Sequence, residues 1–151
     1  DATDEELAKA LHRVNILEFA DQNGGLDMKI LERGENLSGG QCQRIAIARA
    51  LLHDTRIYIF DEATSNIDVE SESDILALIH EMAKSRTVIF ITHRLANVVN
   101  ADRIYVLCEG RLVESGNHEE LIILNGTYAS LYKTQSELEN IRREDTHEEE
   151  K

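Results

Sequence analysis

The sequence predicts an α/β domain built around a parallel sheet. Two continuous apolar runs, "RIYIF" at residues 56–60 and "TVIFI" at 87–91, are rich in β-branched and aromatic side chains, which is typical of strands covered on both faces. Between them, apolar residues recur at helical spacing over 75–82. Residues 57–91 therefore indicate one β-α-β unit, and such units cross over with a right hand.

The composition fits a single domain with a hydrophobic core. The chain has 151 residues, of which 42% are hydrophobic, and a formal net charge of -13 that disfavours non-specific binding to nucleic acid or anionic lipid. No apolar run approaches the roughly 20 residues of a membrane span, so we expect the chain itself to be soluble. Cys42 and Cys108 have no pair spacing, which favours free thiols in a reducing compartment.

Helices are expected before the first strand. Thr3 and Glu6 form a capping-box pattern that opens a short amphipathic helix. Residues 21–36 are rich in Gly and Asn and predict a loop with little regular structure. Ser38 and Gln41 repeat the capping-box pattern and open a second helix, whose predicted buried stripe comprises Ile45, Ala48 and Leu52.

The part of the chain after the second strand predicts a hairpin and two helices. Residues 103–117 alternate as in a hairpin that turns at Glu109-Gly110. Asn117 and Glu120 cap a helix that runs through Leu124 and ends at Gly126, and a further helix is expected over 127–141. The acidic tail, placed at residues 135–151, is too charged to pack, so we expect it to be frayed.

Acidic residues and a histidine follow the two predicted strands. Ligands of open parallel sheets gather at the carboxyl ends of the strands, where Asp61-Glu62 and Thr92-His93 lie. Asp61 is placed to hold Mg²⁺, directly or through water, and Glu62 to orient and deprotonate a water molecule. The alternative is that the acid pair caps a turn and that His93 is its hydrogen-bond partner.

A second candidate site lies at the start of the second helix. Ser38, Gly39 and Gly40 would present exposed backbone N–H groups at the positive end of the helix dipole, and glycines allow a phosphate to approach closely. The alternative is an ordinary helix N-cap followed by flexible glycines.

Several motifs together resemble the ATP-binding-cassette (ABC) ATPases. "LSGGQ" at residues 37–41 is similar to their signature sequence, "IYIFDE" at 57–62 to their Walker B strand, "SNID" at 65–68 to their D-loop and "THR" at 92–94 to their switch-histidine loop. The order and spacing match as well. The ending "GNHEELIILNGTYASLYKTQ" further resembles the cassettes of ABC exporters, in which the membrane domain usually precedes the cassette in the same polypeptide.

The resemblance implies a role for each matching residue, with ATP and Mg²⁺ as cofactors. Asp61 would assist Mg²⁺, Glu62 would be the catalytic carboxylate, and His93 would contact the γ-phosphate. The partners implied are a second nucleotide-binding domain, paired head to tail, and a transmembrane domain, which puts the cassette on the cytoplasmic side of a membrane; no nucleic acid is implied. The signature surface that would close over the partner's ATP is Ser38, Gly39, Gly40 and Gln41, and Asp68 would help join the two sites.

The resemblance also implies elements that these residues do not contain. No Gly-Lys dipeptide occurs, so a phosphate loop of the type G-x-x-x-x-G-K-[ST] is missing, and no Gln loop or adenine-stacking aromatic precedes the signature. We therefore expect an incomplete P-loop NTPase fold of the ABC ATPase type: a partial helical signature subdomain at 1–53, the C-terminal half of the nucleotide-binding core at 54–134, and the tail. Cys42 stands where a basic residue is common, which should matter little.

Two other functions are alternatives to a transporter ATPase. A lobe of a chromosome-maintenance or DNA-repair ATPase would share the signature and the Walker B strand, but the chain shows no long heptad pattern before Glu35 and is strongly acidic. A non-catalytic module that only pairs with a complete cassette would not need Glu62 and His93.

These expectations predict that the 151-residue chain does not bind MgATP by itself, because the residues that would cradle the β- and γ-phosphates are missing. Calorimetric titration of MgATP into the purified chain should therefore give no binding heat. Binding of one nucleotide per chain would contradict the assignment of an incomplete site.

Overall fold

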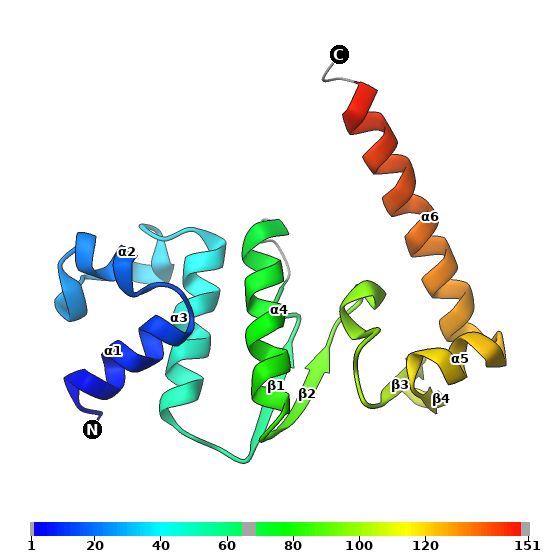
Figure 1. Cartoon of the computed structure of the whole chain (residues 1–151), viewed down its shortest axis with the longest axis horizontal. Coiled ribbons are helices and arrows are strands. Elements are labelled where there is room, and N and C mark those ends of the chain that lie inside the picture. The colour runs from blue at the N-terminus through cyan, green and yellow to red at the C-terminus, as the bar shows by residue number, and fades with distance from the viewer. Residues whose placement is uncertain (1, 65–68, 149–151) are drawn as a thin grey trace. The chain divides into compact units, whose positions relative to one another are not determined.

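A computed structural model of the chain describes residues 2–64 and 69–148 (Figure 1). The chain divides into two compact units, Asp1–Ile91 and Thr92–Lys151, and each is described by itself. The elements of the first unit are α1 (Asp4–Arg13), α2 (Leu17–Gln22), the 3-10 turns η1 (Gly25–Asp27) and η2 (Glu32–Gly34), α3 (Gly39–Leu52), β1 (Ile57–Asp61), α4 (Val69–Ala83) and β2 (Thr87–Ile91).

Both capping boxes predicted for the first unit are present. The Thr3 hydroxyl accepts from the Glu6 amide while the Glu6 carboxylate accepts from the Thr3 amide, and this second bond lowers the pKa of Glu6. Ser38 and Gln41 make the same exchange at the start of α3. Helix α2 was not predicted, and its N-terminus has no side-chain cap that the sequence could have indicated. The loop that follows it contains the short turns η1 and η2.

Strands β1 and β2 pair in parallel, with Ile57 opposite Thr87 and Asp61 opposite Ile91. Helix α4 connects them, which confirms the β-α-β unit. Tyr58 and Phe60 are buried in a core shared with α4 and with α1 and α3 (Figure 1). The α4 side chains in this core are the predicted ones, Ile75, Leu78, Ile79 and Met82.

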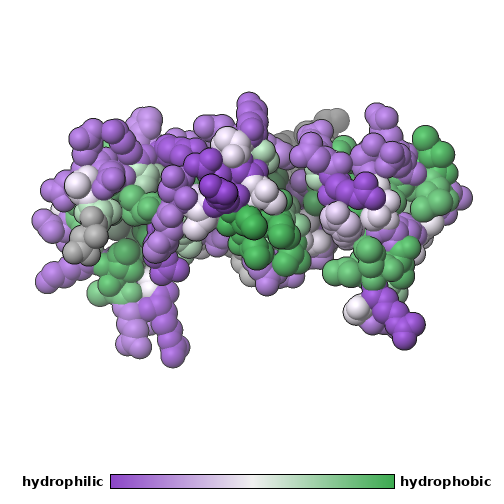
Figure 2. All heavy atoms as spheres, turned by 90° about the horizontal axis from the view of Figure 1, so that it is seen from below, coloured by the Kyte–Doolittle hydropathy of each residue, from purple (hydrophilic) through white to green (hydrophobic). Residues whose placement is uncertain are grey.

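The strand pair, expected to be covered on both faces in a complete sheet, is covered on one face only within the described residues, as an incomplete nucleotide-binding core would leave it. On the face opposite Tyr58 and Phe60, Ile57 and Ile59 are 56% and 65% exposed, and Ile89 and Ile91 are 47% and 48% exposed. No described element packs over these side chains, so the apolar run has one buried and one exposed face. Figure 2 shows hydrophobic patches separated by polar surface on one side of the molecule.

Arg44 connects three helices of the first unit, and no local sequence pattern predicts this. Its guanidinium donates to the Val14 carbonyl (2.9 Å) at the end of α1 and to the Asp74 carboxylate (3.0 Å) on α4. The Arg44 side chain is only 12% exposed, so these bonds satisfy a charge that is largely removed from water. The helix that begins at the signature is thereby fixed to its neighbours.

The second unit is a hairpin covered by helices. Its elements are the 3-10 turn η3 (Leu95–Val98), β3 (Ile104–Cys108), β4 (Arg111–Gly116), α5 (His118–Leu124) and α6 (Thr127–Glu148). The hairpin turns at Glu109-Gly110, both with positive φ, as predicted. Its core is formed by Ile104, Val106, Leu121 and Tyr128, against which Leu95, Val98, Ala101 and Tyr132 pack.

Asn117 and Glu120 cap α5 as predicted, and α5 ends at Asn125 in the left-handed conformation. Glu114 of β4 then caps α6, because its carboxylate accepts from the backbone amides of Thr127 and Tyr128. A Cβ at Gly126 would collide with this carboxylate, so a larger residue there would displace the Glu114 side chain from the cap. The strand and the helix are thus joined at the start of α6.

The frayed tail expected at residues 135–151 differs from the structure, in which α6 continues beyond the predicted helix of 127–141 as far as Glu148. The prediction was based on the lack of apolar residues for packing, but helix formation depends on other properties. The segment has no Gly or Pro and is rich in Glu and Arg, which favour helix locally, and Lys133 lies 3.9 Å from Glu137 on the exposed surface. Residues 149–151 lie outside the described part.

The cap made by Glu114 predicts a pH-dependent stability. Its amide hydrogen bonds, from Tyr128 first and then from Thr127, lower the pKa of Glu114 in the folded state. The stabilisation is therefore complete above the ordinary glutamate pKa and is lost as the pH falls through the lowered one. Glu114→Gln should unfold more easily at neutral pH, by about 1 kcal/mol or less, and should lose less stability on acidification.

The measurement is urea unfolding of the chain at a series of pH values from neutral to acidic. Glu137→Gln is the matched control, because Glu137 lies on the same unit, is 63% exposed and makes only the weak pair with Lys133. Parallel pH profiles for Glu114→Gln and the unsubstituted chain would contradict the assignment.

Candidate functional site

The predicted carboxylates lie together where β1 ends. Asp61 is the last residue of β1, level with Ile91 at the end of β2, and the Glu62 amide donates to the Ile91 carbonyl at 2.9 Å. Asp61 and Glu62 are exposed, whereas Ala63 and Thr64, which follow at once, are each only 3% exposed. The chain therefore presents two carboxylates to solvent between a strand and a buried turn.

Glu62 adopts an uncommon backbone conformation. Its φ is +48°, in the left-handed region where a Cβ costs roughly 1–2 kcal/mol. The hydrogen bond to Ile91 on one side and the burial of Ala63 on the other hold the residue there. Arg33, Asp54 and three other described non-glycine residues also have positive φ, so the exposure of the acid pair at the end of the strand, and not this conformation alone, supports a functional role.

His93 belongs to the second unit, two residues along the chain from the end of β2. Its side chain is exposed, and its backbone carbonyl accepts from the Gln135 side chain at 2.6 Å. The structure thus brings Asp61 and Glu62 together. The approach of His93 to this pair stays a prediction, because the two units are described separately.

The signature residues form the N-terminus of α3. The Ser38 hydroxyl accepts from the Gln41 amide (3.2 Å), and the Gln41 side-chain oxygen accepts from the Ser38 amide (2.8 Å). Within residues 2–64 and 69–148, the amides of Gly39 and Gly40 donate to no acceptor. The Ser38 O–H and these two amides therefore remain as donors for an anion.

The charge around the start of α3 also suits an anion. Helix α1 has three acidic residues in its first turn, whereas α3 has none to offset the positive end of its dipole. Gly34, just before the signature, is packed so closely that an added Cβ would lie 2.8 Å from the Cys42 sulfur. Cys42 therefore packs against the loop. In Figure 1 the N-terminus of α3 lies at the upper edge of the first unit.

The described residues fit Mg²⁺ only together with further ligands. Among residues 2–64 and 69–148, no group of three or more His, Cys, Asp or Glu side chains is arranged to hold a metal ion. Mg²⁺ is commonly bound by one or two carboxylates together with water and nucleotide phosphates, and Asp61 can supply one such carboxylate. The predicted site residue Asp68 lies outside the described part.

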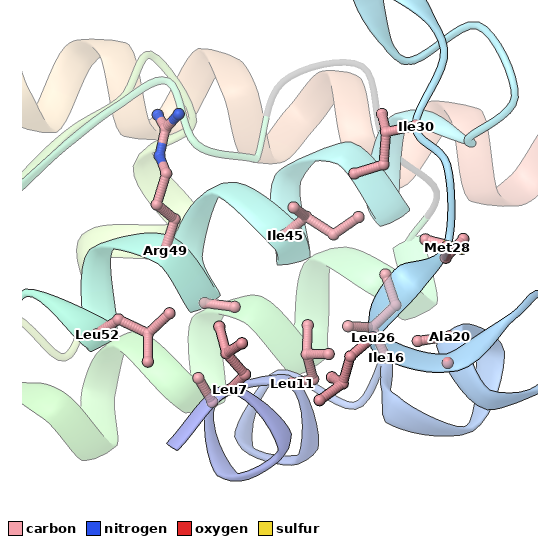
Figure 3. Close-up of a pocket in the computed structure, with 13 residues that line it drawn as sticks. Leu7, Leu11, Ile16, Ala20, Leu26, Met28, Ile30, Ile45, Arg49 and Leu52 are labelled. Atoms are coloured by element: carbon pink, nitrogen blue, oxygen red, sulfur yellow. The ribbon is translucent and has the colours of Figure 1, made fainter. Parts of the chain in front are cut away.

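An apolar cavity in the first unit lies apart from these residues. It has a volume of about 260 Å³ and is lined mainly by side chains of α1, α3 and the loop between α2 and α3 (Figure 3). Leu7, Leu11 and Ile45 project toward it, while the Arg49 guanidinium points away from Leu7 and Leu11. Its lining contains no carboxylate, histidine or cysteine, so it offers no acid-base chemistry.

Gln135 is the residue near the predicted site that sequence reasoning missed. It contacts the loop of His93 although the two residues are far apart in the chain. A single glutamine on a polar helix carries no local signal, and only the packing of α6 on η3 reveals it.

The conformation of Glu62 predicts that glycine is preferred over alanine at this position. Both substitutions remove the carboxylate, but only alanine keeps a Cβ at positive φ. After allowance for the greater freedom of glycine in the unfolded chain, Glu62→Gly should be more stable than Glu62→Ala by about 0.5–1 kcal/mol.

Urea unfolding of both variants is the measurement. The matched pair is Glu81→Gly and Glu81→Ala, at an exposed position of α4, where alanine should be the more stable by about 1 kcal/mol. A Glu62→Ala variant as stable as Glu62→Gly would show that the positive φ is not maintained.

The described helices include none with both the length and the hydrophobicity to cross a membrane.

Comparison with known proteins identifies the chain's relatives. Residues 2–65 match the family model described as ABC transporter. An uncharacterised ABC transporter ATP-binding protein of Haemophilus influenzae is 56% identical over 94% of this chain and 25% of its own length. The ATP-dependent lipid A-core flippase of Mannheimia succiniciproducens is 51% identical over 85% of this chain and 22% of its own length.

A solved structure, a bacterial Atm1-family ABC exporter with ATP bound, has a TM-score of 0.84 and 40% sequence identity to this chain, covering 90% of it and 24% of the exporter chain. The chain thus spans about a quarter of the length of the relatives that it matches. The motifs, the fold and these relatives agree, and the chain belongs to the ATP-binding domains of ABC transporters.

Proposed function

We propose that this chain contributes the Walker B carboxylates, the switch histidine and the signature surface of an ATP-hydrolysing cassette that drives export across a membrane. The observation that carries the proposal is the exposed pair Asp61-Glu62 at the end of β1, with Glu62 held at positive φ. The relatives named as exporter and flippases support export as the direction.

Each residue of the pair has a distinct task in the proposed reaction. Asp61 supplies a carboxylate to Mg²⁺, and bound MgATP supplies the phosphoryl group that is transferred to water. Glu62 lies one residue beyond the strand, orients the attacking water and takes up its proton. Because its backbone is fixed by the Ile91 carbonyl, the carboxylate starts from a defined position. His93 donates a hydrogen bond to a γ-phosphate oxygen.

The donors at the start of α3 would serve a nucleotide held by a second cassette. The Ser38 hydroxyl and the amides of Gly39 and Gly40 suit a γ-phosphate, and Gln41 keeps Ser38 in place through the capping box. In this proposal two cassettes pair head to tail, and Asp68 helps join the two sites. The phosphate-binding loop comes from polypeptide outside these 151 residues.

The cassette is proposed to work on the cytoplasmic side of a membrane, coupled to a transmembrane domain. The relatives that this chain matches are about four times as long as the match, which leaves room for such a domain in the same polypeptide. The net charge of -13 is unsuited to nucleic acid, so the proposal includes no nucleic-acid partner.

The proposed role of Glu62 predicts the behaviour of Glu62→Gln in the complete protein that carries these residues. The amide cannot take up a proton, so ATP turnover should fall by about 100-fold or more, while the affinity for ATP is retained. Turnover is measured by phosphate release, and affinity by nucleotide titration of the same preparation.

Glu81→Gln is the matched control, because it makes the same change on the exposed surface of α4. Wild-type turnover in Glu62→Gln would remove Glu62 from the reaction. Loss of ATP binding in the same variant would show that the residue acts in binding and not in proton transfer.

A further inference from the structure

Gln135 of α6 is bound to the backbone on both sides of Arg94, within the second unit. Its side-chain N–H₂ donates to the His93 carbonyl at 2.6 Å, and its side-chain oxygen accepts from the Leu95 amide at 2.9 Å. One planar amide thus satisfies a carbonyl and an N–H of the loop that carries the switch histidine. Both bonds are made with backbone atoms, so they restrict the backbone conformation of the loop at His93.

The loop has further bonds that favour a single conformation. The Arg94 amide donates to the Thr92 hydroxyl at 3.0 Å, which fixes the residue between the two contacts of Gln135. Leu95 packs against the core of the second unit, as does Tyr132 of α6. Tyr132 and Gln135 are three residues apart on α6 and therefore lie on the same side of the helix. On this side of α6, Gln135 binds the His93 loop, and Tyr132 packs on the same core as Leu95 of that loop.

The helix that carries Gln135 is itself well fixed. Tyr128 is 1% exposed, and its hydroxyl lies 2.8 Å from the His118 ring nitrogen Nδ1. Glu114 holds the first amides of α6 from strand β4. A side chain projecting from so firmly held a helix can fix a loop more accurately than one projecting from another loop.

We propose that Gln135 is a positioning residue for His93, and that it holds the histidine backbone where the side chain can reach the γ-phosphate. The inference rests on the role of His93 in the proposed function. The glutamine amide supplies both a donor and an acceptor at this reach, whereas Glu has no donor, Met has no donor and only a weak acceptor, and Asn is shorter by one methylene. Gln135 itself touches neither nucleotide nor water in this proposal.

The test is steady-state ATP turnover in the complete protein, with Gln135→Met, Gln135→Glu, His93→Ala and the double variant His93→Ala with Gln135→Met. Gln135→Met should lower kcat by about tenfold or more, since small misplacements of a positioned group are costly. Gln135→Glu keeps the acceptor for Leu95 but not the donor for His93, so its kcat should also be low. Glu137→Gln is the control on the same helix and should match the unsubstituted protein.

The double variant tests whether Gln135 acts through His93. If it does, Gln135→Met causes no further loss once His93 is alanine, because the group that it positions is gone. The proposal would be overturned if Gln135→Met lowered kcat by the same factor with His93 present and with His93 replaced by alanine. It would also be overturned if Gln135→Met left kcat unchanged while His93→Ala lowered it. Unchanged kcat in His93→Ala would instead refute the role of His93 in the proposed function, and the inference about Gln135 with it.

Hydrogen exchange gives a readout that does not depend on activity. The Leu95 amide loses its acceptor in Gln135→Met, so exchange in a peptide covering residues 92–98 should become faster, while Gln135→Glu should retain protection. Unchanged exchange in Gln135→Met would show that the two hydrogen bonds do not hold the loop, and would overturn the proposal.

Discussion

The parallel pairing of β1 with β2 is the interaction on which the candidate site depends. Tyr58 and Phe60 fix β1 against α4, and the register places Asp61 level with Ile91. The next hydrogen bond, from the Glu62 amide to the Ile91 carbonyl, continues this pairing one residue beyond β1. Glu62, which donates it, has a positive φ. The backbone position of Glu62, the proposed catalytic residue, is therefore set by the core and not by the loop alone.

The features that the sequence predicted correctly are those with local causes. The three capping boxes need residues three apart, the hairpin needs Glu109-Gly110 at its turn, and the α4 stripe needs only helical spacing. The features that it missed depend on contacts between distant residues. Arg44 reaches α1 and α4, and Gln135 reaches the His93 loop, yet each is an ordinary polar residue on a helix. The helical tail was missed because packing and helix propensity are separate properties.

The exposed face of the β1–β2 pair shows that an apolar run predicts a strand more reliably than it predicts which faces of the strand are covered. A run without alternation correctly predicted strands, since β-branched and aromatic residues favour them. It also indicated cover on both sides, which the described residues supply on one side only, leaving Ile57, Ile59, Ile89 and Ile91 exposed. Exposed apolar side chains gathered on one sheet face lower the free energy when they meet another apolar surface, so this face is suited to contact with further polypeptide.

The two candidate sites differ in what they offer a nucleotide, and the difference explains why both are needed. At the end of β1, Asp61 and Glu62 offer only acceptors and negative charge, which repel phosphate unless a cation lies between. At the start of α3, the capping box occupies the acceptors of Ser38 and Gln41 and leaves the Ser38 O–H and two glycine amides as donors. The first arrangement suits Mg²⁺ and a water to be deprotonated, and the second suits the phosphate itself. In the proposed function, one nucleotide would meet the first surface in this cassette and the second in its partner.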